Sequence, residues 1–439
     1  MLAGSIILAV ASYCNPMSIP DMPIGMCCRD QANSEKSSGG LWYRDTVEQY
    51  RELADPTLIV DGGEYWLFPS CGAAWKSTDG AKWTHVPVEL PGIGYAPTVV
   101  KHEGKFYATS SSAPLLVADA LTGPWKAMGD IELPAGSPPL ADPMLFSDGG
   151  VLYMYWGCTP KRGIWGGVLE LADTIKVVDG RELVPAEPDK HPWMRQTYDP
   201  KVAWMEGAWM IKIGNCYALT YSASGTENAS YAMGVAYGDS PLGEFKVDEN
   251  NPFFKKTTGL VTGTGHGSIV KGPDGAYYVV YCIAVGARHG FERFIGFDRL
   301  NVDEKAGKIL GTVPTEVPAG MSVLGNYGGF NLKSCEIGKD FVVNMPESKS
   351  VKAFRVIWRE VGLDTLRGVM PGPIQYRVWG QSPNGNWQTV YDASKNDVDL
   401  LVDYRELPKS VCCQSVKLEV IGAPKDITPA LVDFTIFGD

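Results

Sequence analysis

The sequence predicts an all-β protein in which a five-bladed β-propeller is followed by a β-sandwich. One strand–turn–strand segment recurs five times between residues 53 and 310, and short alternating strands of another kind fill the region after residue 329. The chain also contains 50 glycines and 31 prolines and few long runs of helical period, which favours many turns and little helix.

Each repeat combines a short apolar segment, a glycine-containing turn and an aromatic-rich segment. In chain order, the repeats begin at Asp55, Ala96, Asp142, Glu206 and His266. A glycine turn between such runs predicts a β-hairpin. The steps of roughly 40 to 65 residues suit one four-stranded blade with variable loops. Because the innermost strand of every blade borders the central channel, we expect the five starting residues to face one another.

The rest of the chain predicts a loop, a junction and a second domain. An excursion over 187–196, between the third and fourth repeats, is expected to form part of a cleft rim. The composition shifts to Pro and Gly over 313–329, as at a domain junction. Alternating segments at 353–358 and 375–379 then predict antiparallel strands of a sandwich. We therefore expect a propeller over residues 1–320 and a sandwich over residues 321–439.

Composition limits the classes of partner. With 439 residues, the chain exceeds what one core usually organises, and 45% apolar residues are ample for two packed interiors. The net charge of −11 argues against nucleic acid, because phosphate binding needs clustered Lys and Arg. A neutral carbohydrate, either a small molecule or a polysaccharide, fits this surface better. The oligomeric state stays open.

The N-terminal apolar run over residues 4–11 has two interpretations. It could form part of a secretory signal, but no Lys or Arg precedes it. We expect it instead to be a strand that closes the propeller ring, with a cytoplasmic location favoured over secretion. No other run approaches the length of a membrane span.

The ten cysteines show no metal-binding spacing and do not match the dense disulfide frameworks of small secreted domains. Several stand singly inside apolar strands, such as Cys282. We expect these to be reduced and to behave as small hydrophobic residues.

Three of the five repeats begin with a carboxylate, and this suggests acid–base chemistry. Like charges a few ångströms apart raise at least one pKa, so a shared pocket separates an acid from a base. Cleavage of a glycosidic bond needs such a pair, one to protonate the leaving oxygen and one to activate water. Glu206 has the longer side chain and precedes a glycine, so we assign it as proton donor, Asp55 as base and Asp142 as modulator.

A single Asp-Pro dipeptide is usually only a turn, so the assignment depends on the equivalence of the repeats. Pro56 and Pro143 are expected to hold the preceding aspartates in an extended backbone at strand starts. Asp199 lies outside the repeat register and is interpreted as a loop residue, and Asp21 and Asp30 are weaker candidates for the base.

Other residues are candidates for the pocket wall. His266 could bind a central ion through water or simply be a satisfied channel histidine. Arg293 could reach inward to sugar hydroxyls or form a surface ion pair with Asp298. Trp75 and Tyr95 could stack on a sugar face or belong to the core, and Ala96 lies beside them in the second repeat.

As a set, the repeat motifs resemble glycoside hydrolase family 43. The motifs, in order, are Ala54-Asp55-Pro56, Tyr95-Ala96-Pro97, Asp142-Pro143-Met144, Glu206-Gly207-Ala208 and His266-Gly267-Ser268. The likeness covers about residues 13–310. It implies a five-bladed propeller and an inverting mechanism, with Asp55 as base, Asp142 as modulator and Glu206 as acid.

The resemblance also implies that Tyr95 and Ala96 border the terminal sugar and that His266 lines a central site that holds calcium in some members. No cofactor is implied for the chemistry itself. The C-terminal region resembles discoidin-like, galactose-binding-like sandwiches at Asn386-Trp387 and over 434–437. Its implied role is packing or weak sugar binding, and the sequence does not choose.

The leading hypothesis is an exo-acting glycosidase that releases α-L-arabinofuranose or β-D-xylose from plant polysaccharide side chains or oligosaccharides. A galactofuranosidase of the same fold is an alternative, and a non-catalytic carbohydrate-binding propeller is another. The chain has no phosphate-binding glycine loop, no Gly-x-Ser-x-Gly elbow and no His-Glu-x-x-His pair.

Overall fold

The computed structural model of the protein forms two compact units, mainly 51–319 and 320–439, with residues 42–50 grouped with the second. It describes residues 43–44, 49–50, 53–70, 74–80, 83–197, 199–257, 261–285, 293–314, 330–331, 341–364, 367–397, 399 and 401–438. The domain boundary predicted after residue 320 falls outside this part of the chain and stays a prediction, as does the strand predicted at residues 4–11.

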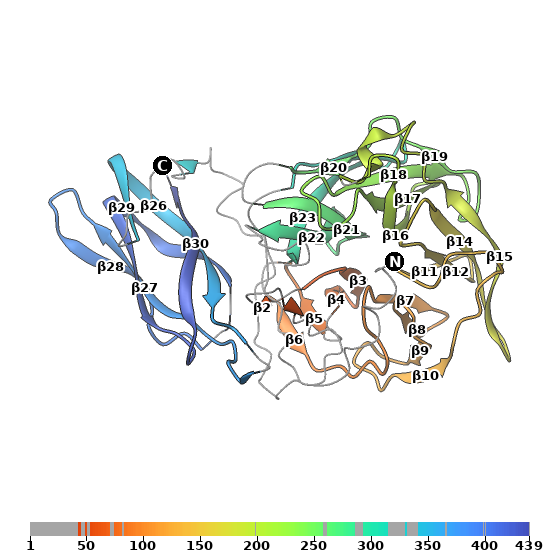
Figure 1. The fold of residues 1–439 in the computed structure, drawn as a ribbon, viewed down its shortest axis with the longest axis horizontal. Helices are drawn as coiled ribbons and strands as arrows, with labels where there is room; N and C mark the ends of the chain where they lie inside the picture. Colours follow the sequence, from red (N-terminus) through yellow and green to blue (C-terminus); the bar gives the residue numbers. More distant parts are fainter. Residues whose placement is uncertain are drawn as a thin grey trace. The chain divides into compact units, whose positions relative to one another are not determined.

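The first unit is a five-bladed β-propeller whose sheets surround a common axis (Figure 1, orange to green). Blade 1 contains β3 (Thr57–Asp61), β4 (Glu64–Phe68), β5 (Ala74–Ser77) and β6 (Thr84–Val86). Blade 2 contains β7 (Thr98–His102), β8 (Lys105–Thr109), β9 (Leu115–Ala118) and β10 (Lys126–Gly129). Blade 3 contains β11 (Met144–Asp148), β12 (Val151–Trp156), β14 (Ile164–Leu171) and β15 (Ile175–Val184).

The last two blades have longer inner strands. Blade 4 contains β13 (Thr159–Pro160), β16 (Trp204–Ile213), β17 (Cys216–Ala223), β18 (Ala232–Gly238) and β19 (Lys246–Val247), with β20 (Phe254–Lys255) paired to β18. Blade 5 contains β21 (Val261–Lys271), β22 (Tyr277–Val285), β23 (Arg293–Asp303) and β24 (Lys308–Gly311). The predicted excursion before β16 includes a short 3-10 helix, η1 (Pro192–Met194).

The inner strands close a ring. Contacts run from β3 to β7, β11, β16 and β21, and β21 returns to β3. The ring closes through the backbone N–H of Leu58 in β3, which donates to Ser268 Oγ of β21 at 2.8 Å. Ring closure is therefore what brings the first and last repeats, more than 200 residues apart, to one channel.

Glycine turns set the inner hairpins. Gly62 and Gly63 join β3 to β4 with φ of +60° and +82°, and Gly149 and Gly150 join β11 to β12 with +60° and +78°. Two successive positive φ values define the type I′ turn, whose twist matches that of antiparallel strands. The hairpins predicted from the glycines are thus formed by the conformation that glycine favours.

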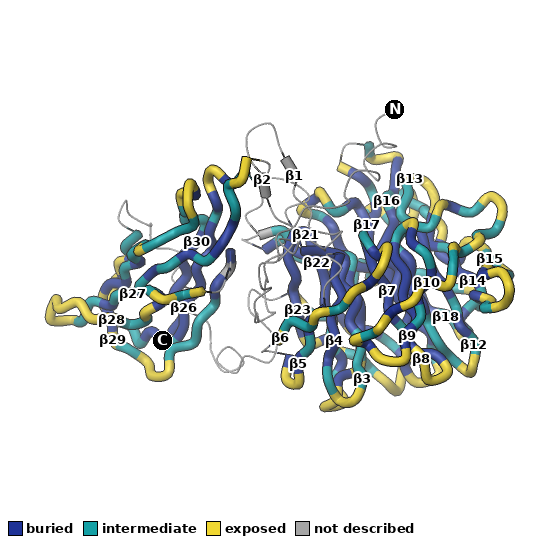
Figure 2. Tube along the Cα trace, turned by 90° about the horizontal axis from the view of Figure 1, so that it is seen from below, coloured by how far each residue is buried: buried dark blue, intermediate teal, exposed yellow. Residues whose placement is uncertain are grey.

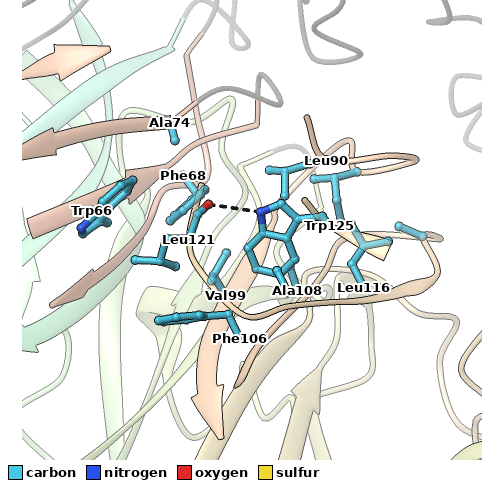
Figure 3. Packing of buried hydrophobic residues seen from close by; sticks show 13 residues of the cluster. Trp66, Phe68, Ala74, Leu90, Val99, Phe106, Ala108, Leu116, Leu121 and Trp125 are labelled. Carbon is cyan, nitrogen blue, oxygen red and sulfur yellow. Dashed lines mark hydrogen bonds between the residues drawn. The ribbon is translucent and has the colours of Figure 1, made fainter. Parts of the chain in front are cut away.

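Neighbouring blades are joined by apolar side chains. Between blades 1 and 2, Trp66 and Phe68 of β4 belong to one buried cluster with Val99 and Phe106 (Figure 3). Trp125 belongs to this cluster, and its indole N–H donates to the Leu121 carbonyl at 3.1 Å, which satisfies its polar atom. Figure 2 shows buried residues running along the blade strands and exposed residues at the turns. The packing holds the blades, and so the channel residues, in fixed positions.

The second unit is a C-terminal β-sandwich. Its strands are β25 (Phe330–Asn331), β26 (Val342–Val361), β27 (Gln375–Gln381), β28 (Trp387–Ala393), β29 (Val402–Gly422) and β30 (Thr428–Gly438), in the order β25-β30-β26-β29-β27-β28. Strands β26 and β29 have 20 and 21 residues, and breaks in their register allow long strands to bend between layers. A separate pair consists of β1 (Tyr43–Arg44) and β2 (Gln49–Tyr50).

Two further sequence predictions can be compared with the described residues. The five cysteines described there, at positions 158, 216, 282, 412 and 413, are all free. Within the same part of the chain, no helix has both the length and the apolar character needed to cross a membrane.

Candidate active site

The residues that start the repeats share an unusual backbone conformation. Asp55, Ala96, Asp142 and His266 have φ of 49°, 49°, 50° and 41°. Positive φ is uncommon outside glycine and carries a strain that surrounding structure must offset. The extended backbone predicted for the two aspartates before proline is therefore wrong. Ala96 precedes proline and His266 precedes glycine, so the geometry of the blade rather than the following residue sets this conformation.

A ring of five small side chains holds these positions. Each lies 15 or 16 residues after the start of its own repeat and bonds to the start of the next one: Ser70, Ser111, Cys158, Ser222 and Cys282. Four of them accept a backbone N–H. The distances are 2.8 Å from Ala96 to Ser70, 3.0 Å from Asp142 to Ser111, 2.7 Å from His266 to Ser222 and 2.9 Å from Asp55 to Cys282. The last of these joins blade 1 to blade 5.

Blade 4 departs from the pattern by one residue. Its left-handed residue is Gly207, with φ of +59°, and the register of β16 against β17 shifts between Glu206 and Trp209. Glu206 therefore precedes the position that Asp55 and Asp142 occupy, which corrects the predicted equivalence of the three carboxylates. A Cβ on Gly207 would lie 2.9 Å from the His266 ring, so glycine is needed here for close packing as well as for φ.

Asp55 is held in a buried ion pair. Arg293 Nη1 donates to Asp55 Oδ1 at 2.7 Å and Nη2 donates to Oδ2 at 3.3 Å, while Ser70 Oγ donates to Oδ2 at 3.0 Å. Burial favours the neutral carboxyl, but the positive charge of Arg293 outweighs it with help from His266 and these hydrogen bonds, so the pKa of Asp55 is lowered. Asp55 is thus kept ionised, as a base must be.

Asp142 has the opposite electrostatics. Burial, together with the nearby charges of Glu206 and Asp55, raises the pKa of Asp142 to about 7 against the opposing effect of His266. Its side chain is 12% exposed, and Ser111 Oγ lies 3.4 Å from its Oδ1. The two aspartates therefore differ in protonation around neutral pH although their backbones are alike.

Glu206 accepts hydrogen bonds from three different side chains. Trp204 Nε1 donates to Oε2 at 2.7 Å, the Cys158 thiol donates to Oε2 at 3.2 Å, and the Tyr231 hydroxyl donates to Oε1. The glutamate is 5% exposed. These contacts fix the direction of the carboxyl group within the channel.

His266 links the two aspartates. Its Nδ1 lies 3.1 Å from Asp55 Oδ1 and 3.5 Å from Asp142 Oδ2. One atom each of His266, Asp142 and Glu206 lies within 4.8 Å of the others. Carboxyl groups from blades 1, 3 and 4 and a histidine from blade 5 thus form one cluster, which can supply both an ionised and a protonated carboxyl.

Residues 43–304 match the family model "Glycosyl hydrolases family 43". The chain belongs to this family. Family 43 membership makes the protein a glycoside hydrolase, and the clustered carboxyl groups are its candidate acid–base residues.

Among curated proteins, this family 43 enzyme is 23% identical over 259 residues to a β-D-galactofuranosidase, xynD, of Aspergillus niger, covering 52% of this chain and 73% of the relative. It is 27% identical over 181 residues to a β-xylosidase of Xylanibacter ruminicola, covering 33% of this chain and 53% of the relative. Among solved structures, a thermostable family-43 glycoside hydrolase matches with a TM-score of 0.50 and 22% identity, covering 62% of this chain and 97% of that chain. This structural match supports the fold.

The structure places the remaining predicted residues of the family 43 enzyme in different settings. Arg293 is 4% exposed and reaches inward, so the alternative of a surface pair with Asp298 is wrong, and Asp298 instead accepts from Tyr281. Ala96 is buried beside Ser70, and Tyr95 is half-buried. Trp75 is fully buried in β5 against the ring of His85, a packing role typical of core aromatics. Sugar contacts by these residues stay predictions.

The donor set does not match a directly bound calcium ion. Calcium takes six to eight oxygen ligands, whereas imidazole nitrogen suits transition metals. Both oxygens of Glu206 already accept hydrogen bonds from protein donors. A calcium ion held by His266 through water stays a prediction from the sequence, and no catalytic step depends on it.

Several residues around the cluster were not identified from the sequence. The ring of serines and cysteines has a detectable signal in the sequence, because its members lie 15 or 16 residues after each repeat start. Cys282 was expected to be only a small hydrophobic residue, yet it accepts the Asp55 N–H. Tyr231 and Trp204 have no such regularity and could not have been found this way. Asp199 caps a turn through Lys201 N–H at 3.0 Å, as predicted for a loop residue.

Proposed function

We propose that this family 43 enzyme is an exo-acting, inverting glycosidase that releases terminal α-L-arabinofuranose or β-D-xylose from plant polysaccharide side chains or oligosaccharides. The observation that carries the proposal is the cluster in which His266 joins Asp55 and Asp142 beside the buried Glu206, with Arg293 holding the pKa of Asp55 low. An ionised base and a second carboxyl group that can carry a proton are what acid–base cleavage of a glycoside requires.

In the proposed mechanism, the Asp55 carboxylate takes a proton from a water molecule that attacks the anomeric carbon. Glu206 gives its proton to the glycosidic oxygen as the bond to the leaving group breaks, so the charges balance and the configuration inverts. Arg293 keeps Asp55 ionised before the reaction. Asp142 and His266 hold the two reacting carboxyls in their positions, and we expect those carboxyls to lie about 6.5–9.5 Å apart.

The substrate proposal is supported by two relatives and by sugar stereochemistry. One relative is named a β-D-galactofuranosidase and the other a β-xylosidase. α-L-Arabinofuranose and β-D-galactofuranose share the arrangement of ring substituents and differ in the exocyclic chain. A pocket for the first sugar therefore needs only additional room to accept the second, and galactofuranose is the alternative substrate. Tyr95 and Ala96 are proposed to border the terminal sugar.

A panel of 4-nitrophenyl α-L-arabinofuranoside, β-D-xyloside and β-D-galactofuranoside tests this proposal. We expect turnover of at least one of the first two and its loss in the Glu206→Gln variant, which keeps the size of the side chain. Activity on galactofuranoside alone would replace the proposed sugar with the alternative. Equal activity of wild type and Glu206→Gln would remove the acid assignment.

A non-catalytic carbohydrate-binding propeller makes a different prediction. It would bind sugars without turnover, and Asp55→Asn would bind as tightly as the wild type. Calorimetry with xylo- and arabino-oligosaccharides, run beside the hydrolysis assay, separates the two functions. Whether the C-terminal sandwich adds sugar binding is measured in the same titrations with Trp387→Ala, because Trp387 is 42% exposed on the edge strand β28.

A further inference from the structure

The loop between β17 and β18 contributes hydrogen bonds near both proposed catalytic carboxyl groups, Glu206 and Asp55. Tyr231 lies at its end and bonds to Glu206, while Thr226 lies near its start and bonds to the arginine that holds Asp55. We propose that the segment 224–231 positions the proton donor and the base together, with Tyr231 and Thr226 as its two positioning residues. This inference rests on the proposed roles of Glu206 and Asp55.

Tyr231 is built to keep a fixed hold on Glu206. The tyrosine is fully buried, and its hydroxyl donates to Oε1 while Trp204 and Cys158 donate to Oε2. The indole N–H of Trp204 can only donate, whereas a hydroxyl can donate to a carboxylate or accept from a carboxylic acid. Tyr231 can therefore stay bonded to Glu206 before and after proton transfer.

The position of the Tyr231 ring depends on a glycine in the next blade. A Cβ on Gly265 would lie 2.2 Å from Tyr231 Cε1 and 2.4 Å from Cδ1, which is too close for either group to remain in place. Gly265 also precedes His266, so the ring is packed against the strand that carries another residue of the cluster. This close packing limits the orientations that the tyrosine hydroxyl can adopt.

Thr226 also accepts a hydrogen bond from Arg293. The Nη1 group donates to Asp55 Oδ1 at 2.7 Å and to Thr226 Oγ1 at 3.1 Å. Because both acceptors share one nitrogen, the threonine fixes the rotation of the guanidinium group about the Asp55 carboxylate. A shift of Thr226 would therefore change the direction in which Asp55 faces its water.

Asn228 fixes the shape of the segment itself. Its Nδ2 donates to Ser224 O at 2.7 Å, to Gly225 O at 3.2 Å and to Gln196 Oε1 at 3.0 Å. Gln196 belongs to the excursion before β16 and is 2% exposed. The excursion over 187–196 is therefore hydrogen-bonded to the segment 224–231 and helps to hold its shape. Asn228-Ala229-Ser230 has the sequence of an N-glycosylation sequon. Asn228 is 9% exposed and its amide nitrogen is engaged in these bonds, so the sequon is closed to glycosylation in the folded protein.

The two positioning residues are predicted to affect different halves of the reaction. Proton donation matters most for a poor leaving group and least for one that departs readily as an anion. Activation of water is needed for every leaving group. Loss of the Tyr231 contact should therefore depend on the leaving group, and loss of the Thr226 contact should not.

The test compares Tyr231→Phe and Thr226→Val on two glycosides of the sugar that the wild type cleaves, one with 2,4-dinitrophenol and one with methanol as leaving group. We expect Tyr231→Phe to lower kcat for the methyl glycoside about 10-fold or more and for the dinitrophenyl glycoside much less, with KM nearly unchanged. We expect Thr226→Val to lower kcat by a similar factor for both substrates.

Matched controls come from the same blade. Tyr221→Phe and Thr220→Val remove buried hydroxyls of β17 that contact neither catalytic carboxyl, since Thr220 Oγ1 bonds to the Trp209 carbonyl at 3.3 Å. Both should keep wild-type kcat on both substrates. Equal losses on the two substrates for Tyr231→Phe, or wild-type kinetics for both loop variants, would overturn the inference.

Failure of the proposed function gives a different result. In that case the wild type cleaves neither substrate, or Glu206→Gln retains full activity. If Tyr231→Phe folds poorly, Gly265→Ala provides a second variant, because it displaces the tyrosine ring without removing the hydroxyl. Gly265→Ala should show the same leaving-group dependence of kcat as Tyr231→Phe. If kcat of Gly265→Ala did not depend on the leaving group, the role of Tyr231 would be contradicted.

Discussion

Each unit of the protein contains a buried arginine–aspartate pair, and only one of them belongs to the candidate active site. In the sandwich, Arg355 is fully buried and its Nη2 lies 3.0 Å from Asp433 Oδ2. In the propeller, Arg293 Nη1 lies 2.7 Å from Asp55 Oδ1. Burial and ion-pair length are therefore similar in the two regions.

The surroundings of the two pairs differ. Arg355 and Asp433 lie on adjacent strands of one sheet, and the Thr435 hydroxyl donates to the Asp433 carboxylate at 2.6 Å. These bonds connect neighbouring residues of the same two strands. Asp55 and Arg293 lie 238 positions apart on different blades, and Asp55 has a left-handed backbone with His266 at 3.1 Å. A buried ion pair alone is structural, whereas crowding with further titratable groups on a strained backbone indicates chemistry.

The first prediction removes the carboxylate of each pair. Asp55→Asn should lower kcat about 10²- to 10⁴-fold, because the base is lost, while Asp433→Asn should leave kcat near the wild-type value. Steady-state hydrolysis by both variants, after confirming by circular dichroism that each is folded, makes the comparison. A loss of turnover in Asp433→Asn that matches Asp55→Asn would mean that the two pairs do not differ in function.

The second prediction removes the arginines. Arg293→Met and Arg355→Met each leave a buried carboxylate without its cation, which typically costs about 3–5 kcal/mol of folding free energy. Only Arg293→Met should also abolish most of the activity under conditions where the protein stays folded. Urea unfolding followed by tryptophan fluorescence gives the stability change, and an unaltered unfolding midpoint in both variants would contradict the ion-pair account.

A third prediction uses pH to separate the two aspartates of the site. The raised pKa of Asp142 means that the folded state keeps a proton that the unfolded state releases, so its contribution to stability falls as pH rises from about 4 to about 7. Asn at this position carries no charge, so Asp142→Asn should stabilise the protein by a few kcal/mol at pH 8, since one pKa unit is about 1.4 kcal/mol, and by little near pH 4.

Asp55 should show the opposite dependence. Its lowered pKa adds stability above the ordinary aspartate pKa, and this contribution is lost as pH falls through the folded-state value. Thermal unfolding of wild type, Asp142→Asn and Asp55→Asn between pH 3 and pH 8 shows whether the stability contributed by each aspartate rises or falls with pH. Parallel curves for the two variants would show that the aspartates titrate alike.

The smallest effect is expected from Gly207→Ala. The positive φ of this residue costs an alanine about 1 kcal/mol, and the added Cβ would press on the His266 ring. Gly385→Ala in the sandwich is the matched control, because it also has positive φ, +88°, but has open space around its Cβ. The free energy of unfolding should fall by a similar amount in both variants because of the positive φ, and only Gly207→Ala should lose activity. Equal activity in both variants would mean that His266 tolerates the displacement.

The sequence predicted the features that depend on local patterns. Glycine turns with aromatic runs predicted the five blades, and the repeat starts predicted that Asp55, Asp142, Glu206 and His266 would meet. Arg293 was predicted to reach inward as one of two alternatives. These predictions succeeded because a propeller repeats the same local geometry in each blade, so position in the repeat determines position in the channel.

The failures concern details that neighbouring blades decide. The left-handed backbone of Asp55 and Asp142 follows from N–H bonds to Cys282 and Ser111 in adjacent blades, which override the local preference before proline. The one-residue shift at Glu206 comes from an irregular register in β16 that no turn or repeat marks. Tyr231 reaches Glu206 from the end of the loop between β17 and β18, at a position that no repeat motif marks.

Carboxyl groups from three blades are proposed to act together as one inverting acid–base site. Proton NMR of a reaction on the aryl glycoside that the wild type cleaves fastest, recorded before the free sugar mutarotates, tests it most directly. We expect the first sugar released to have the anomeric configuration opposite to that of the substrate. Release of the sugar with the configuration retained would contradict it.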